Sequence, residues 1–282
     1  MINQVSVPKV KDLFFDFQGI EVQPFAYSGI ENMTLFSQDD VAWEPLNRLF
    51  DLLNAIVDIN PRIITIDSKN IQVKQNIECR YPCVQDVYKQ EITYPEIDMR
   101  GLLVRGGYFM QSDGSAKIVG PAYIGPAVQI RHNGGILGQV IIGDGESHNY
   151  PSEPGHEGHG GIIGQGVTVR RSVIRAGGKI YSGSEIVDCL IGRNVQIGPG
   201  AQFAHENFSG REVSFPRFND RLLEKPILTG RHKLGIVIGD GCFIGANVTA
   251  YPGVVLFPKC RIPGGTVLKP GIYEPDYFKD LG

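Results

Sequence analysis

Histidine is the residue type with the clearest catalytic potential in this chain, and its distribution is uneven. All six histidines follow residue 100, and most lie in two polar stretches, residues 145–161 and 204–235. A neutral imidazole can take up a proton near neutral pH, so a histidine held beside a nucleophile can act as a general base. An exposed histidine in a polar loop is more often simply solvated, so its surroundings decide between the two roles.

The segment His156-Glu157-Gly158-His159 offers a second kind of chemistry, because two imidazole nitrogens could bind zinc. Its two histidines are three residues apart in a glycine-rich loop, which is neither a helix nor the face of a regular element. Cys79 and Cys83 have no matching pair elsewhere, and the five cysteines are irregularly spaced. We therefore expect no metal site and no disulfide framework.

A six-residue repeat of aliphatic side chains identifies the element that must position these loops. Isoleucines recur at every sixth position from 118 to 142, the pattern returns between 163 and 203, and it runs a third time from 238 to 268. Small or branched residues often follow four positions later. A period of six is typical of a parallel β-helix, in which three hexads make one coil and glycine, asparagine or aspartate forms the corners. A β-sandwich would alternate at every second residue instead.

Glycine content divides the chain into two parts. Of its 36 glycines, only Gly19 and Gly29 precede residue 101. We expect residues 1–100 to form a small mixed α/β domain, with one helix ending at Asn60-Pro61 and strands at 63–67 and 71–73. Residues 101–282 are predicted to form the β-helix, with loop insertions at 145–161 and 204–235. The first part is expected to cap the first coil, and residues 270–282 to cover the last.

Composition and charge exclude several classes of protein. With 42% apolar residues and a net charge of −3, the chain can bury a large core and has no bias toward polyanions. General disorder and nucleic-acid binding are therefore not expected. No apolar run approaches 18 residues, and the N-terminus lacks a basic region followed by an apolar one. We expect a cytoplasmic protein with no membrane segment.

Several sequence blocks resemble a known family. They include IVGPAYIGPAVQIRHN, LIGRNVQIGPGA and GRHKLGIVIGDGCFIGANV, the last at the end of a long insertion. The stretch from Ile118 to Tyr273 resembles the left-handed β-helix domain of the bifunctional N-acetylglucosamine-1-phosphate uridylyltransferase/glucosamine-1-phosphate acetyltransferases. It is closer to archaeal sugar-1-phosphate nucleotidylyltransferases with an acetyltransferase tail. The family's nucleotidyl-transfer domain is not evident, because residues 1–100 are too few and lack its glycine-rich phosphate-binding loop.

The resemblance implies a mainly β fold with a left-handed β-helix, assembled as a homotrimer. It also implies transfer of an acetyl group from acetyl coenzyme A to a sugar phosphate or nucleotide sugar, in a cleft between subunits. The family's phosphate-binding cations fall on Arg131 and Arg170, and its pantetheine groove falls on Ala246 and Gly264. The other substrate-binding candidates that the resemblance suggests are Lys179, Asn207, Arg231 and Lys233.

The family's base histidine is replaced in this chain. Register places Ser182 at the histidine position and Glu185 at that of a tyrosine three residues later. A serine hydroxyl cannot act as a base near neutral pH without another base beside it. The family's asparagine before the long loop falls on His205, so we expect His205 to act as the general base, oriented by Glu206 or Glu185. The two histidines of segment 156–159 compete for this role.

Two other functions remain open from the sequence. The loss of histidine at Ser182 favours a non-catalytic trimeric scaffold or a regulatory relative of sugar nucleotidylyltransferases. Histidines on a β-helix are also found in the γ-type carbonic anhydrases, so a zinc hydrolyase is a third possibility. Binding of acetyl coenzyme A or of a sugar phosphate would favour the transferase, and stoichiometric zinc would favour the hydrolyase.

Overall fold

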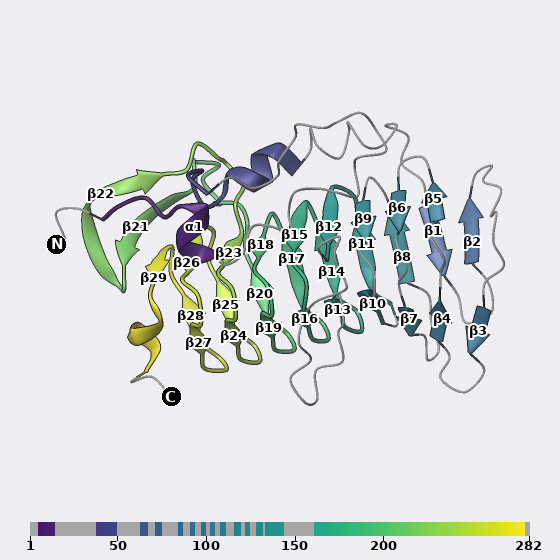
Figure 1. The fold of residues 1–282 in the computed structure, drawn as a ribbon. Coiled ribbons are helices and arrows are strands. Elements are labelled where there is room, and N and C mark those ends of the chain that lie inside the picture. Colours follow the sequence, from purple (N-terminus) through teal and green to yellow (C-terminus); the bar gives the residue numbers. More distant parts are fainter. Residues whose placement is uncertain are drawn as a thin grey trace.

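The protein is mainly β and is built from short strands (Figure 1). The computed structural model describes residues 5–14, 38–49, 63–66, 71–74, 84–86, 91–93, 97–99, 102–104, 108–110, 116–119, 122–124, 128–131, 133–143 and 161–279. None of the helices in this part of the chain is long and apolar enough to span a membrane.

The strands form three sheets, which run side by side along the length of the molecule. The first sheet has the order β2 (Ile71–Lys74), β1 (Ile63–Ile66), β8 (Ala116–Val119), β11 (Gly135–Leu137), β14 (Thr168–Arg170), β17 (Glu185–Val187), β20 (Gln202–Phe203), β25 (Thr249–Ala250) and β28 (Val267–Leu268). The second has the order β27 (Arg261–Ile262), β24 (Phe243–Ile244), β19 (Gln196–Ile197), β16 (Gly178–Ile180), β13 (Gly161–Ile163), β10 (Val128–Ile130), β7 (Tyr108–Met110), β4 (Glu91–Thr93) and β3 (Val84–Asp86). The third has the order β22 (Arg221–Leu228), β21 (Ser214–Phe218), β29 (Gly271–Tyr273), β26 (Val254–Leu256), β23 (Ile236–Ile238), β18 (Leu190–Ile191), β15 (Ser172–Ile174), β12 (Val140–Ile142), β9 (Ala122–Ile124), β6 (Leu102–Val104) and β5 (Ile97–Met99).

Consecutive strands visit the three sheets in a fixed rotation. From β10 the chain passes to β11 in the first sheet, to β12 in the third and back to β13 in the second, where β13 pairs in parallel with β10. Ile163, Ile180 and Ile197 are direct partners on successive strands of the second sheet, so each of these two coils takes 17 residues, whereas the coil from Ile244 to Ile262 takes 18. This topology is consistent with the predicted β-helix.

The repeated aliphatic residues fill the space between the sheets. Each sheet contributes one inward column of side chains, and these columns form one hydrophobic core. The columns contain Ile130, Ile163, Ile180, Ile197, Ile244 and Ile262 in the second sheet, Ile136, Val169, Ile186, Phe203, Ala250 and Leu268 in the first, and Ile142, Ile174, Ile191, Ile238, Leu256 and Tyr273 in the third. Successive hexads enter successive sheets, so a six-residue period buries every member of the repeat.

Close stacking of the coils explains one of the corner glycines. A Cβ atom on Gly245 would lie 2.4 Å from the backbone nitrogen of Gly264 on the next coil. Real Cβ atoms do not approach other heavy atoms so closely, so only glycine fits without moving the backbone. The turns between the second and first sheets, which we call the glycine corner, contain Arg131, Ser182, Gly245, Ala246 and Gly264.

The outer face of the third sheet is apolar and covered. Its outward column consists of Ile141, Val173, Leu190, Val237, Val255 and Ile272, all buried. The covering side chains come from α1 (Val10–Leu13), from helical residues 44–49 and from the insertion after β20, and they include Leu13, Phe14, Trp43, Leu46, Val213 and Phe215. Residues 5–14 and 38–49 therefore pack on the side of the coils, which the sequence analysis did not anticipate.

Strand pairing changes between β5 and β6. From β6 onward the coil strands pair in parallel, whereas β1, β4 and β5 pair antiparallel with β8, β7 and β6. The expected strands at 63–67 and 71–73 are present as β1 and β2, and they extend the first sheet beyond β8. Of the expected N-terminal helix, residues 44–49 are helical, and the rest lies outside the described residues.

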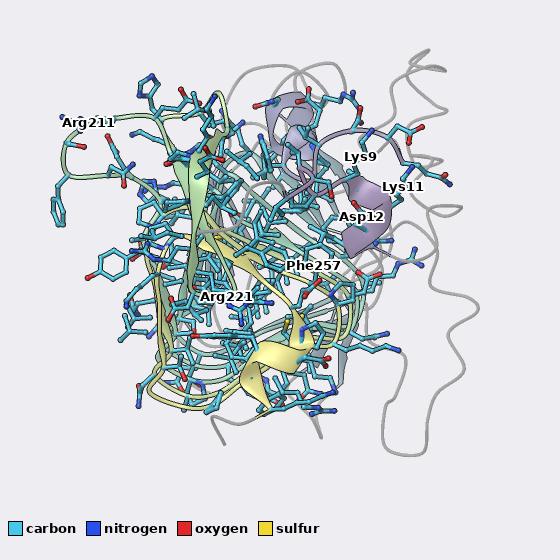
Figure 2. The ribbon with its side chains drawn as sticks, turned by 90° about the vertical axis from the view of Figure 1, so that its left-hand side faces the viewer. Lys9, Lys11, Asp12, Arg211, Arg221 and Phe257 are labelled. Atoms are coloured by element: carbon cyan, nitrogen blue, oxygen red, sulfur yellow. The ribbon has the colours of Figure 1, made fainter. Side chains whose placement is uncertain are left out.

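At the opposite end, the 3-10 helix η2 (Pro275–Phe278) follows the last strand. Phe278 joins the hydrophobic core, and its ring centroid lies 5.8 Å from that of Tyr273. Figure 2 views the molecule from this end and shows Arg211 on a loop that projects from one side, while Lys9, Lys11 and Asp12 lie on and beside α1 at another.

Candidate functional site

The insertion at residues 204–235 leaves the coil between a first-sheet strand, β20, and a third-sheet strand, β23. We call the turns between these two sheets the insertion corner. In three successive coils it contains Arg171, Asp188 and His205, each 17 residues after the previous one. Because the coils in this part of the chain take 17 residues, this spacing stacks the three residues at the same corner.

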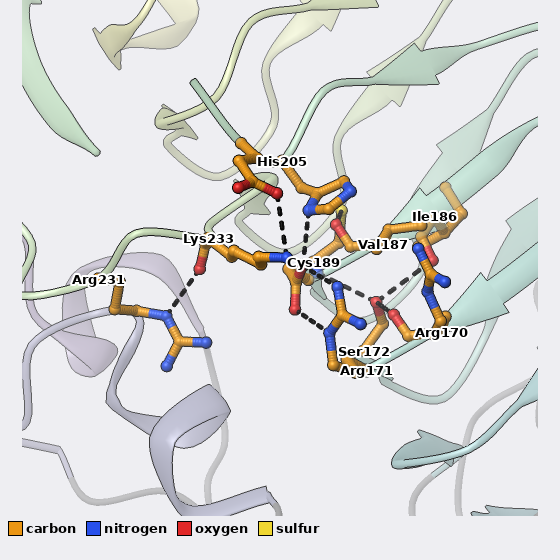
Figure 3. Close-up of polar contacts among 11 residues, drawn as sticks. Arg170, Arg171, Ser172, Ile186, Val187, Cys189, His205, Arg231 and Lys233 are labelled. Carbon is orange, nitrogen blue, oxygen red and sulfur yellow. Dashed lines mark hydrogen bonds and ion pairs between the residues drawn. The ribbon is translucent and has the colours of Figure 1, made fainter. Parts of the chain in front are cut away.

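Arg171 and Asp188 form an ion pair with two hydrogen bonds. Arg171 Nε donates to Asp188 Oδ1 at 2.7 Å, and Arg171 Nη2 donates to Oδ2 at 2.6 Å (Figure 3). The Asp188 side chain is only 3% exposed, and its carboxylate raises the pKa of Arg171. Both residues have positive φ, 44° and 52°, which places each at the apex of a tight turn.

His205 lies on the other side of the same carboxylate. Its Nδ1 is 2.9 Å from Asp188 Oδ2, a distance suited to an ion pair when the ring is protonated, although the two atoms are not aligned for a hydrogen bond. Nδ1 is buried, while the side chain as a whole is 24% exposed, and Figure 3 shows the second ring nitrogen turned away from Asp188. The exposed edge of the ring is therefore the part that a substrate can reach.

The two ends of the insertion fix His205 in place. The backbone N–H of Leu234 donates to the carbonyl oxygen of His205 at 2.8 Å, and Gly235 N–H donates to Asp188 O at 2.9 Å. Glu206 and Lys233 face each other in an antiparallel bridge, and their side chains form an ion pair of 3.0 Å. Lys233 lowers the pKa of Glu206. These contacts form a neck that holds His205 against Asp188.

Arg170 and Arg231 bring two more cations to this corner. Arg170 is the last residue of β14, directly before Arg171, and its buried Nε has no hydrogen-bond partner among the described residues. Arg231 donates through Nε to the carbonyl oxygen of Lys233 and through its guanidinium to Asn47 of the N-terminal helix. Burial lowers the pKa of Arg231. Arg170 thus differs from Arg171 and Arg231, whose Nε atoms each donate to an oxygen of the described residues.

The two carboxylates expected to orient His205 have other surroundings in the structure. Glu206 pairs with Lys233, and Glu185 lies exposed in β17, opposite Gln202 of β20. Asp188, which contacts the imidazole, was not among the predicted residues. The signal that could have found it is the 17-residue spacing of Arg171, Asp188 and His205, which requires the coil length to be known.

The two predicted phosphate-binding arginines are not side by side. Arg131 lies just before β11, at the glycine corner. Arg170 is the last residue of β14, the strand that pairs with β11 in the first sheet, and it therefore lies at the other end of the strands. Lys179 is in β16 of the second sheet, between Ile162 and Gln196 on the neighbouring strands. Of the three predicted cations on the coil strands and turns, Arg170 alone is at the insertion corner.

The predicted coenzyme-binding residues lie next to each other. Ala246 and Gly264 occupy the glycine corner on adjacent coils, where a Cβ on Gly264 would lie 3.1 Å from the carbonyl oxygen of Ala246. Ser182 is at the same corner, beside Gly164. The glycine corner and the insertion corner are at opposite ends of the first-sheet strands, six residues apart along the chain, or up to about 20 Å at 3.3 Å per residue.

The remaining histidine and amide candidates have structural partners or are not described. Asn207 Nδ2 donates to the backbone oxygens of Arg211 and Glu212, which braces the loop after His205. His232 Nδ1 lies 2.9 Å from the oxygen of Gly210. The histidines of segment 156–159, together with Cys79 and Cys83, lie outside the described residues.

Metal and thiol chemistry have no geometric support in the described residues. No group of three or more histidine, cysteine, aspartate or glutamate side chains is arranged there to hold a metal ion. Cys189 follows Asp188 directly, but it is buried, and burial raises the pKa of its thiol to about 12. The thiolate needed for nucleophilic attack is therefore scarce at neutral pH.

Comparison with known proteins finds a relative that shares part of this chain. A bifunctional sugar-1-phosphate nucleotidylyltransferase/acetyltransferase from Sulfurisphaera tokodaii is 36% identical over 117 residues, which are 42% of this chain and 28% of the relative. The match thus spans little more than a quarter of the relative's length. No family model matches the chain. The similarity supports a link to proteins named for sugar-phosphate transfer chemistry.

Proposed function

We propose that this protein transfers an acetyl group from acetyl coenzyme A to the amino group of a sugar phosphate, with His205 as the general base. The observation that carries the proposal is the contact between His205 and the buried carboxylate of Asp188, at the corner where the insertion begins. The name of the partly similar Sulfurisphaera tokodaii protein supports the same chemistry. We also propose that the coil is a left-handed β-helix, as in the family that the sequence resembles.

The exposed nitrogen of His205 performs the proton transfers in this proposal. It takes a proton from the sugar amine as the amine nitrogen attacks the thioester carbonyl carbon. The tetrahedral intermediate then collapses, the C–S bond breaks, and the protonated ring returns a proton to the departing thiolate. The carboxylate of Asp188 stabilises the imidazolium between these two steps.

Arg170 supplies the cation for the sugar phosphate. Arg170 directly precedes Arg171 in the chain, and its buried Nε has no hydrogen-bond partner among the described residues. A guanidinium can hold a phosphate through two parallel hydrogen bonds, which fixes the orientation of the sugar as well as its position. Arg171 and Lys233 serve other groups, since each is paired with a carboxylate.

Acetyl coenzyme A is proposed to lie along the glycine corner, against Ala246 and Gly264. This corner and His205 are separated by the width of the first sheet, so one subunit alone does not place the thioester beside the imidazole at short range. A neighbouring subunit in a homotrimer can do so. The covered outer face of the third sheet leaves the first and second sheets for such contacts.

The first test measures acetyl transfer by the full chain. Purified protein is incubated with acetyl coenzyme A and a panel of amino-sugar phosphates, and the acetylated product is identified by mass. His205→Ala should lower kcat by about 100-fold or more, the usual contribution of a general base. His232→Ala is the matched control and should retain activity, since that ring contacts a loop carbonyl. Absence of both turnover and calorimetric binding would favour the scaffold function instead.

The second test asks whether the site is shared between subunits. His205→Ala removes the base, and Ala246→Trp blocks the proposed coenzyme groove. Mixed assemblies of these two inactive variants contain some interfaces with an intact base and an intact groove, so mixing should restore part of the activity. No recovery after verified subunit exchange would place the whole site within one subunit.

A further inference from the structure

We propose that Asp188, held by Arg171, is the positioning residue for His205. It keeps the proton of the neutral ring on Nδ1, which leaves Nε2 as the proton acceptor. This inference rests on the proposed general-base role of His205 and assigns that role to one ring nitrogen. It also makes a prediction about the resting protein that does not depend on turnover.

The carboxylate of Asp188 is held in a single orientation. Oδ1 accepts a hydrogen bond from Arg171 Nε at 2.7 Å, and Oδ2 accepts one from Arg171 Nη2 at 2.6 Å. The backbone is fixed on both sides, because Asp188 N–H donates to Arg170 O at 3.2 Å and Asp188 O accepts from Gly235 N–H at 2.9 Å. With its side chain 3% exposed, the carboxylate has no room to turn toward solvent.

The orientation of the carboxylate determines the chemistry of the ring. Oδ2 lies 2.9 Å from His205 Nδ1, which is buried and has no other polar partner among the described residues. A carboxylate facing one imidazole nitrogen favours the tautomer that carries its proton on that nitrogen. Nε2 then keeps its lone pair and faces away from the corner.

The charges around the ring are balanced in pairs. Asp188 is neutralised by Arg171, and Glu206 is neutralised by Lys233 across the neck of the insertion. Arg231 is near Asp188 and Arg171 and is anchored on Asn47. Removing Arg171 would leave a buried carboxylate without its cation, which is costly, so Arg171 supports the position of Asp188 rather than acting on substrate.

The main experiment determines the tautomer of His205 directly. The full chain is labelled with ¹⁵N-histidine, the His205 signals are assigned with His205→Gln, and long-range ¹H–¹⁵N spectra are recorded where the ring is neutral. Wild-type protein should show a protonated Nδ1 and a bare Nε2. Asp188→Asn should shift the population toward protonated Nε2, because the new amide can donate to Nδ1. An unchanged tautomer in Asp188→Asn, or a protonated Nε2 in the wild type, would overturn the inference.

A matched control and a second variant separate a specific effect on the tautomer from a general loss of stability. Glu185→Gln removes an exposed carboxylate of β17 that is not part of the neck, and it should leave the tautomer unchanged. If Asp188→Asn does not fold, Arg171→Gln takes its place and should mix the two tautomers, because the carboxylate loses both of its guanidinium hydrogen bonds. Retention of one pure tautomer in Arg171→Gln would remove Arg171 from the role. A purely structural role would lower Tm without changing the ring nitrogens.

Kinetics separates this inference from the proposed function. If the chain acetylates a sugar phosphate, Asp188→Asn should lower kcat by about 100-fold or more and change KM by less than about threefold, because Asp188 acts on the base and not on substrate binding. A fall in kcat/KM through KM alone would contradict the positioning role. If no acetyl transfer is found, the proposed function fails, and the tautomer experiment still decides whether Asp188 sets the protonated nitrogen.

Discussion

The indole N–H of Trp43 donates a hydrogen bond of 3.0 Å to the carbonyl oxygen of Thr229, 186 residues later. The ring of Trp43 also packs against Phe215, with centroids 5.0 Å apart. These two contacts connect the N-terminal helical residues to the insertion that carries Arg231 and Lys233. The side of the candidate site formed by the insertion is therefore supported by a segment that precedes the coils.

Replacing Trp43 with phenylalanine should remove this hydrogen bond and retain an aromatic ring. The carbonyl of Thr229 would be left buried without its indole donor, so we expect the free energy of unfolding to fall by about 1–3 kcal/mol. Urea unfolding measures the change. It is followed by circular dichroism, because the variant lacks the single tryptophan of the chain and cannot be followed by tryptophan fluorescence. Tyr251→Phe, at an exposed position, should leave stability unchanged. Equal stability of Trp43→Phe and wild type would show that the hydrogen bond contributes nothing.

Arg170→Ala should weaken binding of the sugar phosphate. A hydrogen bond to a charged group contributes about 1.5–3 kcal/mol, so KM for the phosphorylated acceptor should rise by about tenfold to a hundredfold while kcat changes little. KM for acetyl coenzyme A should stay the same. Arg221→Ala, which removes an exposed arginine of β22, is the control. An unchanged acceptor KM would move the phosphate site to another cation.

Acidification should loosen the neck of the insertion through Glu206. Its pKa is lowered from 4.5 by the ion pair with Lys233, so the stabilisation is complete above pH 4.5 and is lost as pH falls through the lowered value. The protection of the Leu234 amide against hydrogen exchange, which reports its bond to His205, should therefore decrease between pH 6 and pH 3. High salt should weaken the same exposed pair at pH 6.

Glu206→Gln isolates this effect from other carboxylates. The variant should show lower protection of Leu234 at pH 6 than the wild type, and a smaller decrease on acidification. If wild type and variant have the same profile, the pH dependence belongs to another group at the corner and not to Glu206.

Ile197→Ala should test the stacked core. Ile197 is fully buried and lies between Ile180 and Ile244 on neighbouring strands of the second sheet, so truncation leaves a cavity that the coil cannot close. We expect a loss of about 2–5 kcal/mol in the free energy of unfolding. Val267→Ala, at a side chain that is 57% exposed, should change it by less than about 0.5 kcal/mol. Similar losses in both variants would contradict the inward orientation of the repeat.

Most of what could be predicted about the fold came from the six-residue repeat. It depends only on which residues are aliphatic, and three of its members, Ile180, Ile197 and Ile244, lie in one column of the second sheet. A second pattern was present but was not recognised. Val173, Leu190 and Val237 form an aliphatic column on the outside of the third sheet, which predicts that something covers this face. The segments that cover it could not be predicted, because the spacing of apolar residues within 5–14 and 38–49 does not indicate which surface they contact.

Less of the candidate site than of the fold could be predicted from the sequence. His205 was selected for its position before the insertion, but a carboxylate could be assigned to it only through nearby residues in the chain, such as Glu206. The residue that contacts it, Asp188, is one full coil earlier and becomes a neighbour only when the 17-residue coils are stacked. Likewise, Arg131 and Arg170 occupy successive coils, but the sequence does not show that they lie at different corners.

The neck between His205 and Leu234 has a consequence for how this scaffold can diversify. Residues 204–235 leave and rejoin the coil at points that are one hydrogen bond apart, and Leu190 still pairs with Val237 as if nothing had been inserted. The coil is therefore continuous without the insertion, although the insertion also packs on the coils, since β21 pairs with β29 and Val213 and Phe215 cover the third sheet. Exchanging it between relatives would replace His205 and part of the cover of the third sheet together, while the Arg171–Asp188 pair stays with the recipient.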